Sequence, residues 1–159
     1  MKKPKEQAVF LLKKAGKTVA LAESCTGGLL AASVTDVPGA STVFECGVVI
    51  YSAQMKESLL NIDPILIPTY GVVSRETAAA MACGVRRRGS ADYGIGITGV
   101  AGPGPDGAHP EGDMYVAVAN GTHIVVRHLQ TGTKNQREAN RHAAVDAALQ
   151  LLIAEVTHG

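Results

Sequence analysis

The 159 residues of this chain suffice for a compact fold with a sizeable core, and we expect residues 1–159 to form a single domain. Hydrophobic residues make up 46% of the sequence and charged residues 18%, which indicates a packed α/β protein and excludes a disordered or fibrous chain. The formal net charge of +1 gives no electrostatic reason to expect nucleic acid or an anionic membrane as a partner. No apolar run is long enough for a membrane span or a signal peptide, so the expected location is the cytoplasm.

Helical and β-type hydrophobic patterns alternate along the chain. In order, they predict a helix over 6–15, a strand over 18–22, a helix over 27–35, a strand over 44–51, a helix over 52–60, a helix from a Ser74 cap to about 88, a strand over 93–98, two strands over 114–120 and 122–129, and a closing helix over 138–156. Asn120-Gly121 is a strong hairpin signal between the last two strands. The connection over 99–113 holds five glycines and three prolines, and its length suggests a function.

The first predicted strand leads into a cluster of small polar residues and glycines. Glu23-Ser24-Cys25-Thr26-Gly27-Gly28 separates this strand from the next helix. In open α/β sheets, ligands bind beyond the carboxyl ends of the strands, and glycines let the backbone approach a ligand closely. Free N–H groups at the helix start favour an anion or a developing oxyanion. The alternative is that Ser24 or Thr26 only caps the helix.

A second strand ends in a similar way. Thr98-Gly99-Val100-Ala101-Gly102-Pro103 supplies a hydroxyl group and glycines, so a pocket is expected between the two loops. The pattern favours a domain that binds an anion or a nucleotide, although the chain has neither a Walker P-loop nor a dinucleotide fingerprint. Arg137 and Arg141 lie one turn apart at the start of the last helix, where they either hold a phosphate or lie on a solvated helix face.

Two residues compete as a nucleophile. Ser24 needs a base, and Lys56 and Tyr51 follow the strand over 44–51, so both can face the same cleft. A lysine on a short helix is usually exposed, but burial lowers the pKa of a lysine and makes it a base. Cys25 is the rival, because a helix N-terminus lowers the pKa of a thiol, although a cysteine beside a glycine turn is often only buried filling. A solvated surface position is expected for each histidine: His109, His123, His128, His142 and His158.

Five segments together resemble a known family. They are Ala22-Glu23-Ser24-Cys25-Thr26-Gly27-Gly28, Thr35-Asp36-Val37-Pro38-Gly39-Ala40-Ser41, Gly47-Val48-Val49-Ile50-Tyr51-Ser52 with Lys56, Gly71-Val72-Val73-Ser74, and Ile97-Thr98-Gly99-Val100-Ala101-Gly102-Pro103. In this order they are similar to the carboxy-terminal domain family of the competence-damage protein CinA. The family includes stand-alone enzymes that hydrolyse the amide of nicotinamide mononucleotide to nicotinate mononucleotide and ammonia.

The resemblance implies a three-layer α/β/α fold with a mixed sheet of about five strands. It also implies that the fused amino-terminal domain of full-length CinA, to which pyrophosphatase activity is assigned, is absent here. Ser24 matches the family's nucleophile, Lys56 the base that activates it, and Tyr51 a neighbour that assists. Thr98 matches a threonine that contacts the substrate, and Gly99 follows it in the same loop.

Further expected contacts involve two negative groups, the oxyanion formed in the reaction and the phosphate of the substrate. Backbone N–H groups at Cys25, Thr26 and Gly27 are expected to stabilise the oxyanion. The family's phosphate-directed arginine lies in a Gly-Asp-Arg sequence before the last helix. That motif is altered here, so Arg137 is the first choice for this role and Arg141 the reserve.

Two loops depart from the family's pattern, over 104–113 and 132–136. Both lie toward the ligand, so the alternative function is a catalytically inactive nucleotide-binding module of the same fold. No step of the expected amide hydrolysis requires a cofactor or a metal, and the three cysteines lack metal-ligand spacing. The expected partner is a small nucleotide, and assembly into a homo-oligomer is left open.

Overall fold

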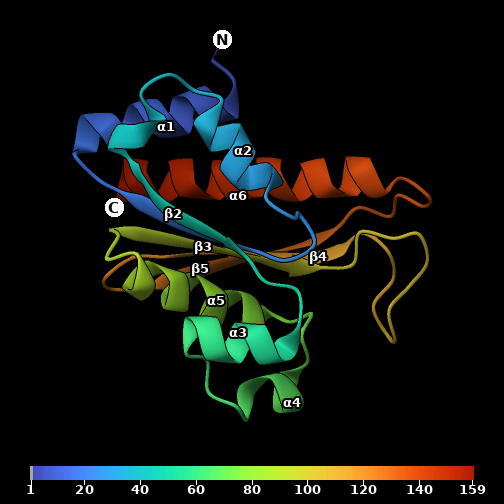
Figure 1. Cartoon of the computed structure of the whole chain (residues 1–159). Helices are drawn as coiled ribbons and strands as arrows, with labels where there is room; N and C mark the ends of the chain where they lie inside the picture. The colour runs from blue at the N-terminus through green and yellow to red at the C-terminus, as the bar shows by residue number, and fades with distance from the viewer. Residues whose placement is uncertain (1) are drawn as a thin grey trace.

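The computed structural model describes residues 2–159 and centres them on a five-stranded sheet in the order β2-β1-β3-β4-β5 (Figure 1). Its strands are β1 (Val19–Glu23), β2 (Phe44–Val49), β3 (Tyr93–Gly99), β4 (Asp113–Ala119) and β5 (Ile124–Gln130). β1 pairs in parallel with β2 and β3, whereas β4 pairs antiparallel with β3 and β5. The sheet is therefore mixed, and the carboxyl ends of its three parallel strands share one edge.

Helices cover both faces of this sheet (Figure 1). One face carries α1 (Pro4–Ala15), α2 (Leu29–Thr35) and α6 (Arg137–His158), and the other carries α3 (Ala53–Leu60), α4 (Leu66–Tyr70) and α5 (Arg75–Arg88). A short 3-10 helix, η1 (Ala40–Thr42), precedes β2. The predicted three-layer α/β/α sandwich with a mixed five-stranded sheet is confirmed. Among the helices of residues 2–159, none has both the length and the apolar character needed to cross a bilayer.

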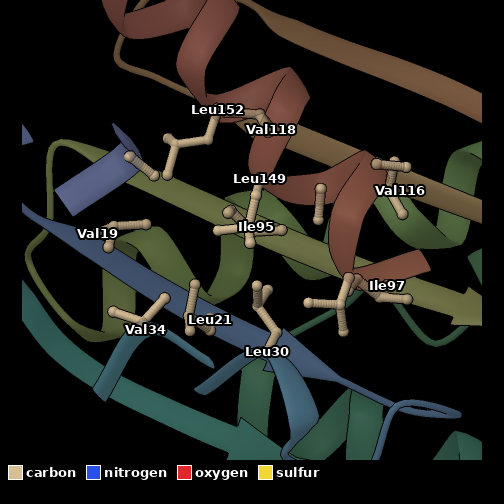
Figure 2. Close-up of a cluster of buried hydrophobic side chains, with 14 of the residues drawn as sticks. Val19, Leu21, Leu30, Val34, Ile95, Ile97, Val116, Val118, Leu149 and Leu152 are labelled. Carbon is tan, nitrogen blue, oxygen red and sulfur yellow. The ribbon is translucent and has the colours of Figure 1, made fainter. Parts of the chain in front are cut away.

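The larger part of the core lies between the sheet and the helices α2 and α6 (Figure 2). Successive strand residues point to opposite faces, so Ile95 and Ile97 of β3 both face this layer. Their side chains are fully buried, together with Leu30 of α2. The helices supply apolar residues at a spacing of three, as in Leu149 and Leu152 of α6. Burial of this apolar surface is the main force that holds the outer helices on the sheet.

The opposite face of β3 has glycines where a core normally has large side chains. A Cβ atom placed on Gly96 would lie 2.4 Å from the carbonyl oxygen of Ala78 in α5. α5 therefore rests directly on the backbone of the central strand. At the start of α5, the Ser74 hydroxyl accepts a 3.1 Å hydrogen bond from the Thr77 N–H as the predicted cap.

Several element boundaries differ from the sequence prediction, and three departures have a local explanation. α2 begins at Leu29 because Gly27 and Gly28 have φ angles of +57° and +100°, which a right-handed helix excludes. α4 was not predicted, since Pro68 lies within it, but a proline is tolerated in the first turn of a helix. The β4–β5 connection spans residues 120–123, where the Asn120 side chain accepts hydrogen bonds from the backbone of residues 122 and 123.

Candidate active site

The site lies where the three parallel strands end. Ser24 follows β1, Tyr51 lies two residues beyond β2, and the loop over 100–112 follows β3. α3 begins at Ala53, two residues after Tyr51, and brings Lys56 back toward the sheet. This edge is where open α/β sheets bind their ligands.

Lys56 is fully buried, although a lysine on a short helix is usually exposed. Its Nζ lies 3.2 Å from the Ser24 Oγ, 3.2 Å from the Ile50 carbonyl oxygen and 2.9 Å from the Tyr51 carbonyl oxygen. The two carbonyls accept N–H bonds, and the remaining position on the nitrogen faces the serine. The structure therefore brings together the two residues that the sequence proposed as nucleophile and base.

Burial disfavours the charged form of this amine and lowers the pKa of Lys56 to about 8. At pH 7 about a tenth of such amines are neutral, compared with fewer than one in a thousand for a solvated lysine. In the neutral form the two N–H groups bond the carbonyls, so the lone pair points at the Ser24 hydroxyl. This arrangement lets the amine accept the hydroxyl proton.

Of the two readings of Cys25, rival nucleophile or buried filling, the structure favours buried filling. Cys25 is buried, and this burial raises its pKa to about 11, whereas the sequence argument had a helix N-terminus lowering it. The nearby arginines Arg137 and Arg141 oppose the rise but do not cancel it. At neutral pH the Cys25 thiol is protonated and is a poor nucleophile.

Glu23 occupies N–H groups at the start of α2. Its buried carboxylate accepts hydrogen bonds from the N–H groups of Leu30, at 2.8 Å, and Ala31, at 3.0 Å. The free helix-start N–H groups expected from the sequence are thus occupied by a side chain of the protein itself. Sequence reasoning missed this cap, since Glu23 was read only as part of the polar segment between the strand and the helix.

We expect Glu23→Ala to lower the free energy of unfolding by about 2–4 kcal/mol. The substitution removes a buried side chain and leaves two helix N–H groups without their acceptor. Urea titration followed by circular dichroism measures this loss. Glu23→Gln is the matched control, because it keeps the volume and one acceptor oxygen and should lose less. An unchanged unfolding free energy for Glu23→Ala would show that the cap contributes nothing.

Backbone donors for an oxyanion remain next to Ser24. The Gly27 N–H donates to the Ser24 carbonyl oxygen at 3.0 Å, so it is not available, contrary to the expectation. Within residues 2–159, the N–H groups of Cys25 and Thr26 have no backbone acceptor. The buried Thr26 hydroxyl also has no hydrogen-bond partner within these residues. Two N–H groups beside the nucleophile are therefore free to bind a negative oxygen.

A hollow of about 250 Å³ opens next to this serine loop. Cys25 and Tyr51 line it on one side, and the loop of residues 99–106 lines much of the rest. Arg137 also borders the hollow; it is exposed and donates one hydrogen bond to the Gly102 carbonyl oxygen. The side chain of Tyr51 is exposed too. Gly99, Tyr51, Cys25 and Arg137 therefore border one space, as the sequence proposed.

Two proposed ligand contacts are occupied by the protein. Thr98 is fully buried, and its hydroxyl donates to the Val72 carbonyl oxygen at 2.9 Å. Arg141 donates to the carbonyl oxygens of Cys25, at 3.0 Å, and Thr26, at 2.9 Å. The neighbouring α6 residue Asn140 holds the Ala101 carbonyl oxygen at 3.0 Å, so the start of α6 fastens both loops of the site.

Two of the histidines expected at solvated surface positions are accessible to solvent but also contact a buried carboxylate. His109 Nδ1 lies 2.7 Å from the buried carboxylate of Asp113, and His128 Nε2 contacts its second oxygen. These bonds, with burial opposing them, lower the pKa of Asp113. No sequence pattern reveals this cluster, because His109 lies in a loop, Asp113 at the start of β4 and His128 on β5. No group of three or more potential ligand residues in the described chain is arranged to hold a metal ion.

Comparison with known proteins shows which family the chain belongs to. Residues 1–156 match the family model of the CinA C-terminal domain. The chain is 49% identical to a CinA-like protein of Anaeromyxobacter sp. over 86% of its own length, and 46% identical to one of Synechocystis sp. over 89%. It spans about a third of the length of these relatives.

Solved structures show the same fold. The protein CihA from Agrobacterium tumefaciens superposes with a TM-score of 0.89 at 33% identity, covering 95% of this chain and 94% of that one. A CinA superfamily protein from Klebsiella pneumoniae superposes with a TM-score of 0.92 at 27% identity, covering 98% and 97%. The chain therefore belongs to the CinA C-terminal domain family.

Proposed function

We propose that this chain hydrolyses the carboxamide of nicotinamide mononucleotide, giving nicotinate mononucleotide and ammonia. The observation that carries the proposal is the fully buried Lys56, whose Nζ lies 3.2 Å from the Ser24 Oγ. Two carbonyls orient the amine, and its lowered pKa makes the neutral form accessible at neutral pH. Such a pair suits acyl transfer from an amide, and the family resemblance supplies the substrate.

The first half of the reaction forms an acyl-enzyme. Neutral Lys56 accepts the Ser24 proton while Oγ bonds to the carboxamide carbon, and the C=O electron pair moves to its oxygen. The N–H groups of Cys25 and Thr26 stabilise this oxyanion. The oxyanion then re-forms the C=O bond as the C–N bond breaks, and the Lys56 ammonium returns its proton to the departing nitrogen. Ammonia leaves, and the acyl group remains on Oγ.

The second half repeats these steps with water. Lys56, again neutral, accepts a proton from water as the water oxygen bonds to the acyl carbon. Collapse of the second oxyanion breaks the bond to Oγ, and the lysine returns the proton to the serine. Nicotinate mononucleotide is released and the starting state is restored. The exposed Tyr51 borders the hollow, where its phenol can assist proton transfer to the departing nitrogen in the first half.

The test is release of ammonia from nicotinamide mononucleotide by the purified protein, with nicotinate mononucleotide as the second product. We expect stoichiometric formation of both. Tight binding of the nucleotide without release of ammonia would overturn the proposal and favour the alternative, an inactive nucleotide-binding module.

Arg137 is proposed to bind the substrate phosphate, because it is exposed at the hollow and has donors left after its bond to Gly102. Arg137→Ala is expected to raise KM for nicotinamide mononucleotide about 10- to 100-fold with a smaller change in kcat. Steady-state kinetics measure this effect. Nicotinamide riboside is the control substrate: it lacks the phosphate, so its KM should not change in Arg137→Ala. An unchanged KM for the mononucleotide would place the phosphate elsewhere.

A further inference from the structure

Arg141 binds the serine loop rather than the hollow. Its Nε donates to the Cys25 carbonyl oxygen at 3.0 Å and its Nη2 to the Thr26 carbonyl oxygen at 2.9 Å. The side chain is half-buried, and it comes from α6, more than 100 residues along the chain from the loop. A planar guanidinium that makes two such bonds restrains two successive peptide groups at once.

Because the peptide bond is planar, a hydrogen bond that holds the Cys25 carbonyl also fixes the direction of the Thr26 N–H. The Cys25 carbonyl and the Thr26 N–H belong to one trans peptide unit, in which C=O and N–H point in opposite directions. Because Arg141 binds the carbonyl, the Thr26 N–H points away from α6. The turn bond from the Gly27 N–H to the Ser24 carbonyl oxygen orients the Cys25 N–H in the same manner.

We propose that Arg141 is a positioning residue that fixes the Thr26 N–H as an oxyanion donor, which rests on the proposed amidase function. The cation also withdraws electron density through the bound carbonyl, so the N–H becomes a stronger donor. Arg141 acts through the peptide group and need not touch the substrate. The sequence had it as a reserve phosphate ligand, and its two bonds to carbonyls favour the positioning role.

Gly27 provides a second observation for this arrangement. It has a φ angle of +57°, and a Cβ atom placed there would lie 3.2 Å from the Arg141 Nη2. The glycine thus lets the turn form and leaves room for the guanidinium against the backbone. The loop and the arginine fit each other as one unit.

The kinetic test compares Arg141→Ala and Arg141→Lys on nicotinamide mononucleotide and nicotinamide riboside. We expect kcat to fall about 10- to 100-fold for both substrates in Arg141→Ala, with little change in KM, because the oxyanion forms only along the reaction. Added guanidinium ion at low millimolar concentration should restore part of kcat. Arg141→Lys keeps the charge but not the two-pronged contact, so it should recover little. A rise in KM confined to the phosphorylated substrate, or an unchanged kcat, would overturn the proposal.

A spectroscopic measurement separates this inference from the proposed function. In ¹⁵N-labelled protein, the Thr26 amide resonance should move in Arg141→Ala and return when guanidinium is added. The matched control is Arg127→Ala, since Arg127 is exposed on β5, and it should leave the Thr26 resonance and the kinetics unchanged. If the wild-type protein released no ammonia, the proposed function would fail, and the Thr26 resonance would still decide whether Arg141 orients that N–H. An unmoved resonance would overturn the inference.

Discussion

Replacing Ser24 with alanine is expected to lower the rate of ammonia release from nicotinamide mononucleotide by at least about 10⁴-fold. The substitution removes the oxygen atom that would form the acyl bond. A water molecule that attacked the amide directly would not be held beside the base as the serine hydroxyl is. Ser24 is buried and alanine is slightly smaller, so the fold should be kept. Steady-state ammonia release, with thermal unfolding as the check on the fold, measures the result.

Cys25→Ala is the matched control for this substitution. The Cys25 thiol has its pKa raised to about 11 by burial, so its loss should change the rate little. A folded Ser24→Ala protein with full activity, or a loss seen only in Cys25→Ala, would assign the nucleophile to the thiol.

Lys56→Met is expected to lower the same rate by a similar factor, because without a base the serine hydroxyl keeps its proton. Methionine retains most of the length and volume of the buried side chain, which limits damage to the fold. The two residues act as a unit, so the double variant Ser24→Ala/Lys56→Met should be no slower than either single variant. Lys56→Arg should also fail, since a guanidinium stays protonated. Additive losses in the double variant would contradict a shared step.

The pH profile of the wild-type protein follows from the same amine. The neutral form of Lys56 is the active one and its pKa is about 8, so kcat/KM should rise about tenfold per pH unit below this value. Above about pH 8 the rate should level off, until the fold or the substrate limits it. A profile that is flat between pH 6 and pH 9 would argue against a neutral lysine as the base.

Local patterns account for what the sequence predicted of the fold. The helix cap at Ser74 and the hairpin at Asn120 rest on interactions within a few residues, which sequence shows directly. The meeting of Ser24 with Lys56 follows from topology, because carboxyl ends of neighbouring parallel strands share an edge. The sequence motifs identified these two residues as candidates, but only the structure gives the distance between their side chains.

The remaining contacts depended on partners that no local pattern identifies. In the sequence, Glu23 reads as the first residue of a connecting segment, and only the packing of α2 shows that its carboxylate caps that helix. In the sequence, Arg141 reads as a phosphate ligand at a helix start. Its true carbonyl partners lie more than 100 residues earlier in the chain, so no local pattern reveals them. In both cases, groups that were expected to bind a ligand are bound by the protein itself: the helix-start N–H groups by Glu23, and Arg141 by two carbonyl oxygens.

The fastening of both site loops by α6 determines when the site can form during synthesis. Cys25 and Arg141 are 116 residues apart, so at about 5–20 residues per second the arginine is made about 6–23 s after the cysteine. A nascent chain can thus hold Ser24 and Lys56 before Arg137, Asn140 and Arg141 exist. Until they do, the carbonyls of both loops lack their partners, and a ribosome-bound intermediate carries the reacting pair without its finished surroundings.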